Sequence, residues 1–152
     1  PKFFDYRAKA LKILEEGSRL EDISKVVGEK ALPNRERFVL YFTKLFKNGY
    51  LIQNAFHVVD RFTPPTVQAR LLEAFIRYYD VMYALAERVP VDEIVRLECS
   101  KMLPKLKYGW AVLDESGERV VGERLEVFDE FYDTLKKEAL ALAERYRVHV
   151  SF

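Results

Sequence analysis

The sequence predicts an all-α fold, a bundle of about five helices with one small β-hairpin near residues 110–121. Apolar residues recur at three- and four-residue spacing along most of the chain. Glycine and proline are few, six of each, and mostly fall between the periodic stretches. With 152 residues, 49% of them hydrophobic, the chain can bury a core without disulfides or metals. We therefore expect residues 1–152 to form a single helical domain.

The first two elements are predicted as short helices that meet at a glycine. Phe4, Ala8, Leu11 and Leu14 recur at helical spacing, and Gly17 follows them as a stop signal. Ser18-Arg19-Leu20-Glu21 then matches a capping box, in which the serine and glutamate side chains satisfy early backbone donors. The second helix is expected over Leu20–Val27, ending at Gly28.

A third helix is expected to open at Pro33-Asn34 and to close at Asn48-Gly49. Its apolar stripe consists of Phe38, Tyr41, Phe42, Leu45 and Phe46. The next stretch, 50–63, has no clear period. Thr63 then reads as a helix cap with Pro64 at the first helical position. The helix that follows runs to about residue 88 on the stripe Val67, Leu71, Phe75, Tyr78, Tyr79, Met82, Leu85 and Ala86.

The last third of the chain is predicted as a short helix, a hairpin and a long helix. Asp92–Cys99 follows the interruption at Val89-Pro90, and Pro104 is expected to break whatever precedes it. Two short apolar runs, 110–113 and 118–121, flank a turn at 114–117 and predict the hairpin, which we treat as an insertion over 109–122. The closing helix is expected over 123–146.

Composition excludes several classes of protein. The 25 Lys and Arg against 24 Asp and Glu leave a net charge of +1, which is little for a protein that must neutralise many phosphates. The single Cys99 excludes a disulfide framework and a multi-cysteine zinc site, and it fits a reducing compartment. No apolar run approaches the roughly 20 residues that span a bilayer. The start at Pro1-Lys2 is no signal peptide and has no initiator Met. These features indicate a soluble intracellular domain that is a fragment or a processed product.

No self-sufficient active site is evident from the sequence. The common phosphate-loop, dinucleotide, zinc and serine-nucleophile motifs are absent. His57 and His149 lack ligand spacing, so packing or surface positions are expected for both, and Cys99 is expected to be a small buried hydrophobe. Tyr50 and Phe56 fall in the aperiodic stretch. Their rings either pack onto the bundle or present a face to a planar ligand, and the residues alone leave both readings open.

Several separated segments together resemble one family. Tyr50-Leu-Ile-Gln53-Asn54-Ala-Phe56-His57, followed by Val59-Asp60 and Phe62, resembles the C-terminal region of the catalytic A subunit of archaeal A-type and related V-type rotary ATPases. The segments Leu20–Gly28, Lys30–Leu32, Phe75–Asp80 and Val89–Ile94 are similar to that family in the same order. The resemblance covers residues 5–108. Val58 stands where the family usually has an acidic residue, and the hairpin is not a family feature.

The resemblance implies a part in a larger machine. Phe56 and Tyr50 would line the adenine pocket, and Gln53 and Asn54 would shape it. ATP or ADP with Mg²⁺ would be held by a preceding P-loop domain that this chain lacks, so the piece alone is expected to be without catalysis. The expected partners are that nucleotide-binding domain, the central rotor stalk and the non-catalytic B subunit, with no nucleic acid and no membrane insertion. The expected location is cytoplasmic, on the periphery of a membrane-bound, ion-translocating complex.

The resemblance also implies a mechanical role: when nucleotide closes the preceding domain against this one, the bundle moves as a body and transmits that closure to the central rotor stalk. For stalk contact we consider the tip 97–107, with Lys101, Lys105 and Lys107, or the turns between paired helices. One alternative is a helix-turn-helix nucleic-acid module built from 18–27 and 34–48. The other is a scaffold that assembles through the heptad stripe of 123–146.

Overall fold

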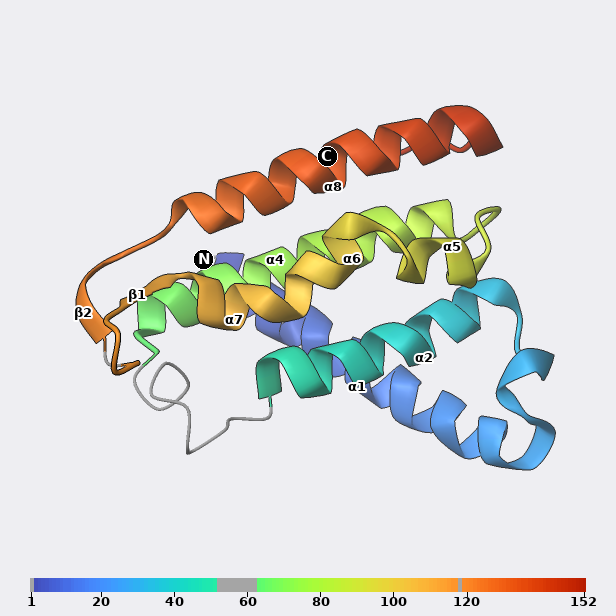
Figure 1. The fold of residues 1–152 in the computed structure, drawn as a ribbon. Coiled ribbons are helices and arrows are strands. Elements are labelled where there is room, and N and C mark those ends of the chain that lie inside the picture. The colour runs from blue at the N-terminus through green and yellow to red at the C-terminus, as the bar shows by residue number, and fades with distance from the viewer. Residues whose placement is uncertain (1, 52–62, 118) are drawn as a thin grey trace.

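The computed structural model describes residues 2–51, 63–117 and 119–152, and in these residues the chain is a helical bundle with one hairpin (Figure 1). The long helices are α1 (Lys2–Val27), α2 (Asn34–Phe46), α4 (Pro65–Leu85) and α8 (Glu126–Tyr146). The short helical turns are η1 (Glu29–Ala31), η2 (Lys47–Leu51), α5 (Val91–Val95), α6 (Glu98–Met102), η3 (Leu103–Lys105) and α7 (Leu106–Gly109). The strands β1 (Ala111–Leu113) and β2 (Arg119–Glu123) pair antiparallel. The predicted all-α class is confirmed.

The prediction of two helices before residue 28 is wrong, because α1 runs unbroken through Gly17. A Cβ at Gly17 would lie 2.1 Å from Oγ1 of Thr43 on α2. The glycine therefore serves the close approach of two helices and is no stop signal. Ser18 is consequently inside a helix, and the capping box predicted there does not form.

The third and fourth helices have the predicted stripes but different ends. Beyond α2 the chain continues into η2, so Asn48-Gly49 does not close it. The fourth helix, α4, begins at Pro65, one residue later than predicted. Proline disfavours the helical conformation of the residue before it, and Pro64 is accordingly extended, with ψ 151°.

The predicted helix 92–99 is divided in two by Leu97, whose backbone is extended with ψ 149°. Pro104 lies in the first turn of η3, where its missing N–H costs nothing, so the chain stays helical into α7 and the predicted break is wrong. Asn34 at the start of α2 holds the turn between α4 and α5 in place. Its side-chain amide nitrogen donates to the backbone carbonyls of Ala86 (2.8 Å) and Val89 (2.7 Å). Its carbonyl oxygen accepts from the backbone of Val91 at 3.1 Å.

The hairpin is confirmed, in the register Ala111↔Glu123 and Leu113↔Arg119. Because the backbone up to Glu123 belongs to this ladder, α8 begins at Glu126 rather than at 123. The heptad stripe predicted for 123–146 consists of Leu125, Phe128, Tyr132, Leu135, Ala139, Leu142 and Tyr146. Phe128, Leu135, Ala139 and Leu142 of this stripe are buried in the core, so these residues are not left for assembly.

The core is aromatic and lies between α2, α4 and α8. Phe38, Phe42, Phe46, Phe75 and Phe128 are each at most 2% exposed, as their helical spacing predicts. The hairpin and the start of α4 lie toward one end of the bundle, whereas the turn between α1 and α2 and the turn between α4 and α5 lie at the other (Figure 1). The bundle therefore has two distinct ends joined by packed helices.

Candidate functional site

Tyr50 lies in η2, directly after the aromatic stripe of α2. Its ring stacks on Phe46 with centroids 5.0 Å apart and an interplanar angle of 15°, and its centroid lies 6.1 Å from that of Phe75. Gly49 makes this packing possible, because a Cβ there would lie 2.8 Å from Cζ of Phe75. The residue is half-buried, and burial raises the pKa of its hydroxyl. Tyr50 is therefore anchored on one side and still reaches the surface.

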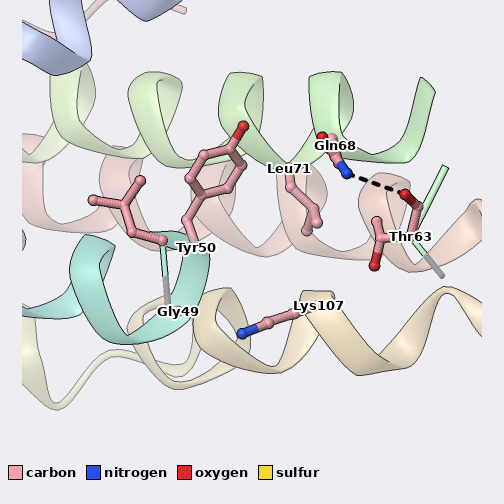
Figure 2. A pocket seen from close by; sticks show the side chains of 7 residues that line it. Gly49, Tyr50, Thr63, Gln68, Leu71 and Lys107 are labelled. Carbon is pink, nitrogen blue, oxygen red and sulfur yellow. Dashed lines mark hydrogen bonds between the residues drawn. The ribbon is translucent and has the colours of Figure 1, made fainter. Parts of the chain in front are cut away.

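A cavity of about 200 Å³ opens beside this residue, where η2, the start of α4 and α7 meet (Figure 2). It is lined by Gly49, Tyr50, Leu51, Thr63, Gln68, Leu71 and Lys107. The lining combines an aromatic side, an aliphatic floor and three polar side chains, which is the usual composition of a small-ligand pocket.

Two polar side chains face this cavity from opposite elements. Gln68 of α4 donates its amide N–H to the carbonyl of Thr63 at 3.1 Å, which fixes the orientation of the amide. Lys107 of α7 is only 6% exposed, so of the three lysines in the tip considered for stalk contact it is not available at the surface. Lys101 and Lys105 of the same tip are exposed. Lys107 instead belongs to the cavity (Figure 2).

A second cavity, of about 300 Å³, lies on the α1 side of Tyr50. It shares Tyr50, Leu51 and Gln68 with the first cavity and is otherwise lined mainly by apolar residues of α1. Tyr50 thus borders open space on two sides and is not sealed inside the bundle.

A third cavity, of about 590 Å³, lies between α4 and α8, far from Tyr50 in the fold. Arg77 stacks there over the ring of Tyr132 at 4.5 Å, and Asp80 is paired with Lys9. The ionisable side chains that line this cavity are Arg77, Lys136, Asp80 and Asp133, two of each sign, so the lining side chains offer no net charge to a ligand.

The described residues contain no cluster of three or more His, Cys, Asp or Glu side chains that could hold a metal ion. Burial raises the pKa of Cys99, and the neighbouring Glu138 raises it further, so this thiol is not activated. The expectation that Cys99 is a small buried residue is confirmed. Ser100 links the Tyr78 hydroxyl (2.7 Å) to the carbonyl of Ile94 (2.6 Å) in a network that lies wholly in the core.

Comparison with known proteins decides the relationship. A family model described as the C-terminal domain of V and A type ATP synthase matches residues 1–95. The chain belongs to this family.

Individual relatives agree with this V and A type ATP synthase family. The A subunit of the A-type ATP synthase from Methanosarcina acetivorans is 37% identical over 109 residues, which cover 71% of this chain and 19% of that protein. A V-type ATP synthase alpha chain 2 from Clostridium tetani is 35% identical over 127 residues, 83% of this chain and 22% of its own length. The corresponding A-type protein from Pyrococcus abyssi is 34% identical over 109 residues, 71% of this chain and 11% of that protein. This chain therefore spans about a fifth or less of the length of these relatives.

Of the four residues predicted to form the adenine pocket of this V and A type ATP synthase domain, the structure describes one. Tyr50 borders the cavity, whereas Phe56, Gln53 and Asn54 lie outside the described residues. Sequence reasoning missed Gln68 and Lys107. Gln68 lies one turn after the start of the helix that proline initiates, and this position beside the aperiodic stretch is a signal that could have placed it near Tyr50. No local sequence feature marks Lys107, which lies beyond the segment that the family model matches.

In the part of the chain that the structure describes, no helix has the combined length and apolar character needed to cross a membrane. The helix-turn-helix alternative requires a separate short helix over 18–27, but these residues are the end of the long helix α1. Its second helix buries its aromatic face, as Phe38 and Phe42 are almost fully covered.

Proposed function

We propose that this domain lines the adenine end of a nucleotide site in the catalytic A subunit of a V/A-type ATP synthase. The observation that carries the proposal is the position of Tyr50, a half-buried ring beside a cavity, at the start of the Tyr-Leu-Ile-Gln-Asn-Ala-Phe-His stretch. The ring is held from behind by Phe46 and Phe75, so it is already ordered before a ligand arrives. Phe56 is the second ring of the proposal, on the strength of the resemblance.

The size of the cavity limits what this domain contributes. Pockets that enclose a whole drug-sized ligand usually measure about 300–1,000 Å³. The cavity beside Tyr50, at about 200 Å³, has room for a base but not for a base, ribose and triphosphate together. In this proposal the phosphates and Mg²⁺ of ATP or ADP are held by a preceding P-loop domain, and this domain is without catalysis on its own.

Base stacking sets the expected strength of the interaction. Stacking on an aromatic side chain contributes about 1–3 kcal/mol in other base-binding proteins, which corresponds to roughly 5- to 150-fold in affinity. This is enough to tune nucleotide affinity in the complete protein. It is too little for the domain alone to retain ATP at ordinary concentrations.

Equilibrium binding of ATP to the complete catalytic subunit tests the proposal. Replacement of either ring, Tyr50→Ala or Phe56→Ala, should weaken ATP binding by about 5-fold or more, because the stacking surface is lost. Tyr50→Phe is the matched control, since it keeps the ring and should leave affinity within about twofold. Thermal unfolding of each variant establishes that the bundle is folded at the assay temperature. Unchanged ATP affinity in folded Tyr50→Ala and Phe56→Ala proteins would contradict the proposal.

The second part of the proposal is mechanical: closure of the nucleotide domain on this one moves the bundle as a body against the central rotor stalk. Close-packed interiors do not deform continuously, so motion at one end of the bundle reaches the other. The turn between α1 and α2 lies far from the cavity end (Figure 1). The end of α1 that leads into this turn exposes Val26 by 85% and Val27 by 55%, an unusual exposure for two adjacent valines. This turn, rather than the tip with the buried Lys107, is the rotor contact that we propose. The domain would then work at the periphery of the complex, beside the non-catalytic B subunit.

A further inference from the structure

We infer that Gln68 and Lys107 read the polar edge of the bound base and so select adenine over bases with a carbonyl at the same place. This inference rests on the proposed function, because it needs a base beside Tyr50. It assigns roles to two residues, one of which lies beyond the segment that the family model matches.

Gln68 presents an acceptor to the cavity. A primary amide can present its oxygen or its NH₂ group to a ligand, and here one of the two N–H bonds is already used within the fold. The NH₂ group donates to the carbonyl of Thr63 at 3.1 Å, and Figure 2 shows the amide oxygen turned away from Thr63, toward the side of Leu71. An acceptor held in this way favours the 6-amino group of adenine. It disfavours the 6-carbonyl of guanine or hypoxanthine, since two acceptors would then face each other.

Lys107 supplies a donor to the same space. It lines the cavity although it is only 6% exposed, and an ammonium at that depth is stable only where acceptors surround it. A lysine ammonium carries three N–H donors and no acceptor. It can therefore donate to a ring nitrogen of the base while it keeps another partner. Together the two side chains offer one acceptor and one donor, the complement of an amino group and a ring nitrogen.

In this inference Tyr50 provides binding strength for any base, whereas Gln68 and Lys107 provide the selectivity between bases. Stacking on Tyr50 does not depend on which base is bound, because every base has a π-face. Discrimination must come from groups at the edge of the base, and a site built to hydrogen-bond a substrate group rejects analogues that lack that group. Among the described residues that line the cavity, Gln68, Lys107 and Thr63 are the polar side chains other than Tyr50. Thr63 contributes its backbone carbonyl, which accepts the hydrogen bond that orients Gln68.

The test compares the binding of ATP and of inosine triphosphate, in which the 6-amino group is a carbonyl, to the complete catalytic subunit. The unaltered protein should bind ATP at least tenfold more tightly. Gln68→Met should weaken ATP binding, because an acceptor for the 6-amino group is lost, and should strengthen binding of inosine triphosphate, because the acceptor that faces its carbonyl is removed, so the preference falls about tenfold or more. Thr66→Ala, an exposed change on the same helix, is the matched control and should preserve it.

Lys107 is tested with the 1-deaza, 3-deaza and 7-deaza analogues of ATP, each of which lacks one ring nitrogen. One analogue should bind the unaltered protein about tenfold more weakly than ATP. Lys107→Met should bind ATP and that analogue equally, whereas Lys105→Met, an exposed neighbour, should behave as the unaltered protein. Equal binding of ATP and all three analogues would overturn the role of Lys107.

Tyr50→Ala in the same assays separates the two proposals. If it weakens ATP and inosine triphosphate alike while Gln68→Met leaves their ratio unchanged, the base pocket stands and the reading of the edge by Gln68 is wrong. If Tyr50→Ala changes neither affinity, the proposed function fails and this inference fails with it.

Discussion

Gly17 sets the distance between α1 and α2. It is buried at the crossing of the two helices, where Thr43 fills the space that a side chain would need. The Thr43 hydroxyl is itself fixed, because it donates to the carbonyl of Val39 at 2.8 Å. Neither helix can move away cheaply, since both are packed against the common core.

Gly17→Ala should therefore lower the free energy of unfolding. Alanine gains about 1 kcal/mol of helix propensity over glycine, but an added carbon in a packed interior costs about 1–3 kcal/mol, and here it would lie 2.1 Å from the Thr43 oxygen. Because an approach of 2.1 Å is a severe clash, we place the cost in the upper part of this range, about 2–3 kcal/mol, and expect a net loss of about 1–2 kcal/mol, measured by urea unfolding. Ser18→Ala is the control: a helix cap would lose stability on this change, whereas an exposed position inside α1 should lose none. A Gly17→Ala variant as stable as the parent would contradict the close approach of the two helices.

At the scale of the elements, α8 is fixed to the bundle by a polar contact as well as by its apolar stripe. The carboxylate of Glu138 accepts hydrogen bonds from the backbone of Glu98 (2.9 Å) and Cys99 (2.7 Å). These are the unsatisfied donors at the start of α6, which has no side-chain cap of its own. A residue from a distant helix thus performs the role that a local cap usually has.

Glu138→Gln should loosen this junction. The amide keeps one acceptor oxygen but places an NH₂ group against the second backbone donor, so one N–H loses its partner. We expect a loss of about 1–3 kcal/mol in the free energy of unfolding and faster reaction of Cys99 with a thiol reagent, because opening of α8 exposes the thiol. Glu144→Gln, exposed on the same helix, should change neither quantity. If Cys99 reacts at the same rate in the Glu138→Gln and parent proteins, the contact does not hold α8 in place.

At the scale of the whole molecule, the fold joins a cavity with room for a base at one end to an exposed turn at the other. The connection between them is stiff because α1, α2 and α4 share one core, and because Asn34 ties the start of α2 to the turn after α4 through three hydrogen bonds. Such a body turns as a unit when one end is pushed.

Crosslinking in the assembled complex tests the rotor contact proposed for the turn between α1 and α2. A photoreactive or bifunctional reagent on Val26→Cys should form an adduct with the central stalk during ATP turnover, and its yield should change with the bound nucleotide. Lys12→Cys, exposed near the middle of α1, is the control site and should give little adduct. The native Cys99 is buried and should not compete. Absence of a stalk adduct from Val26→Cys during turnover would remove the mechanical proposal.

Helix stripes were readable from the sequence because burial imposes a period that each residue carries with it. Phe38, Phe42 and Phe75 were assigned to the core in this way, and the hairpin followed from two short apolar runs around a turn. The family relationship was readable for a similar reason, since its motifs are contiguous in the chain.

What the sequence alone determined about this protein is its local pattern: the all-α class, the stripes and the position of Tyr50 next to a recognisable motif. Tertiary contacts decided whether Gly17 ends a helix or admits a neighbour, and whether Lys107 meets water or a cavity, because both answers depend on residues distant in sequence. The cap that Glu138 provides is of the same kind. A propensity is a property of a few neighbouring residues, whereas steric fit and burial belong to the assembled core, and there the larger free energies lie.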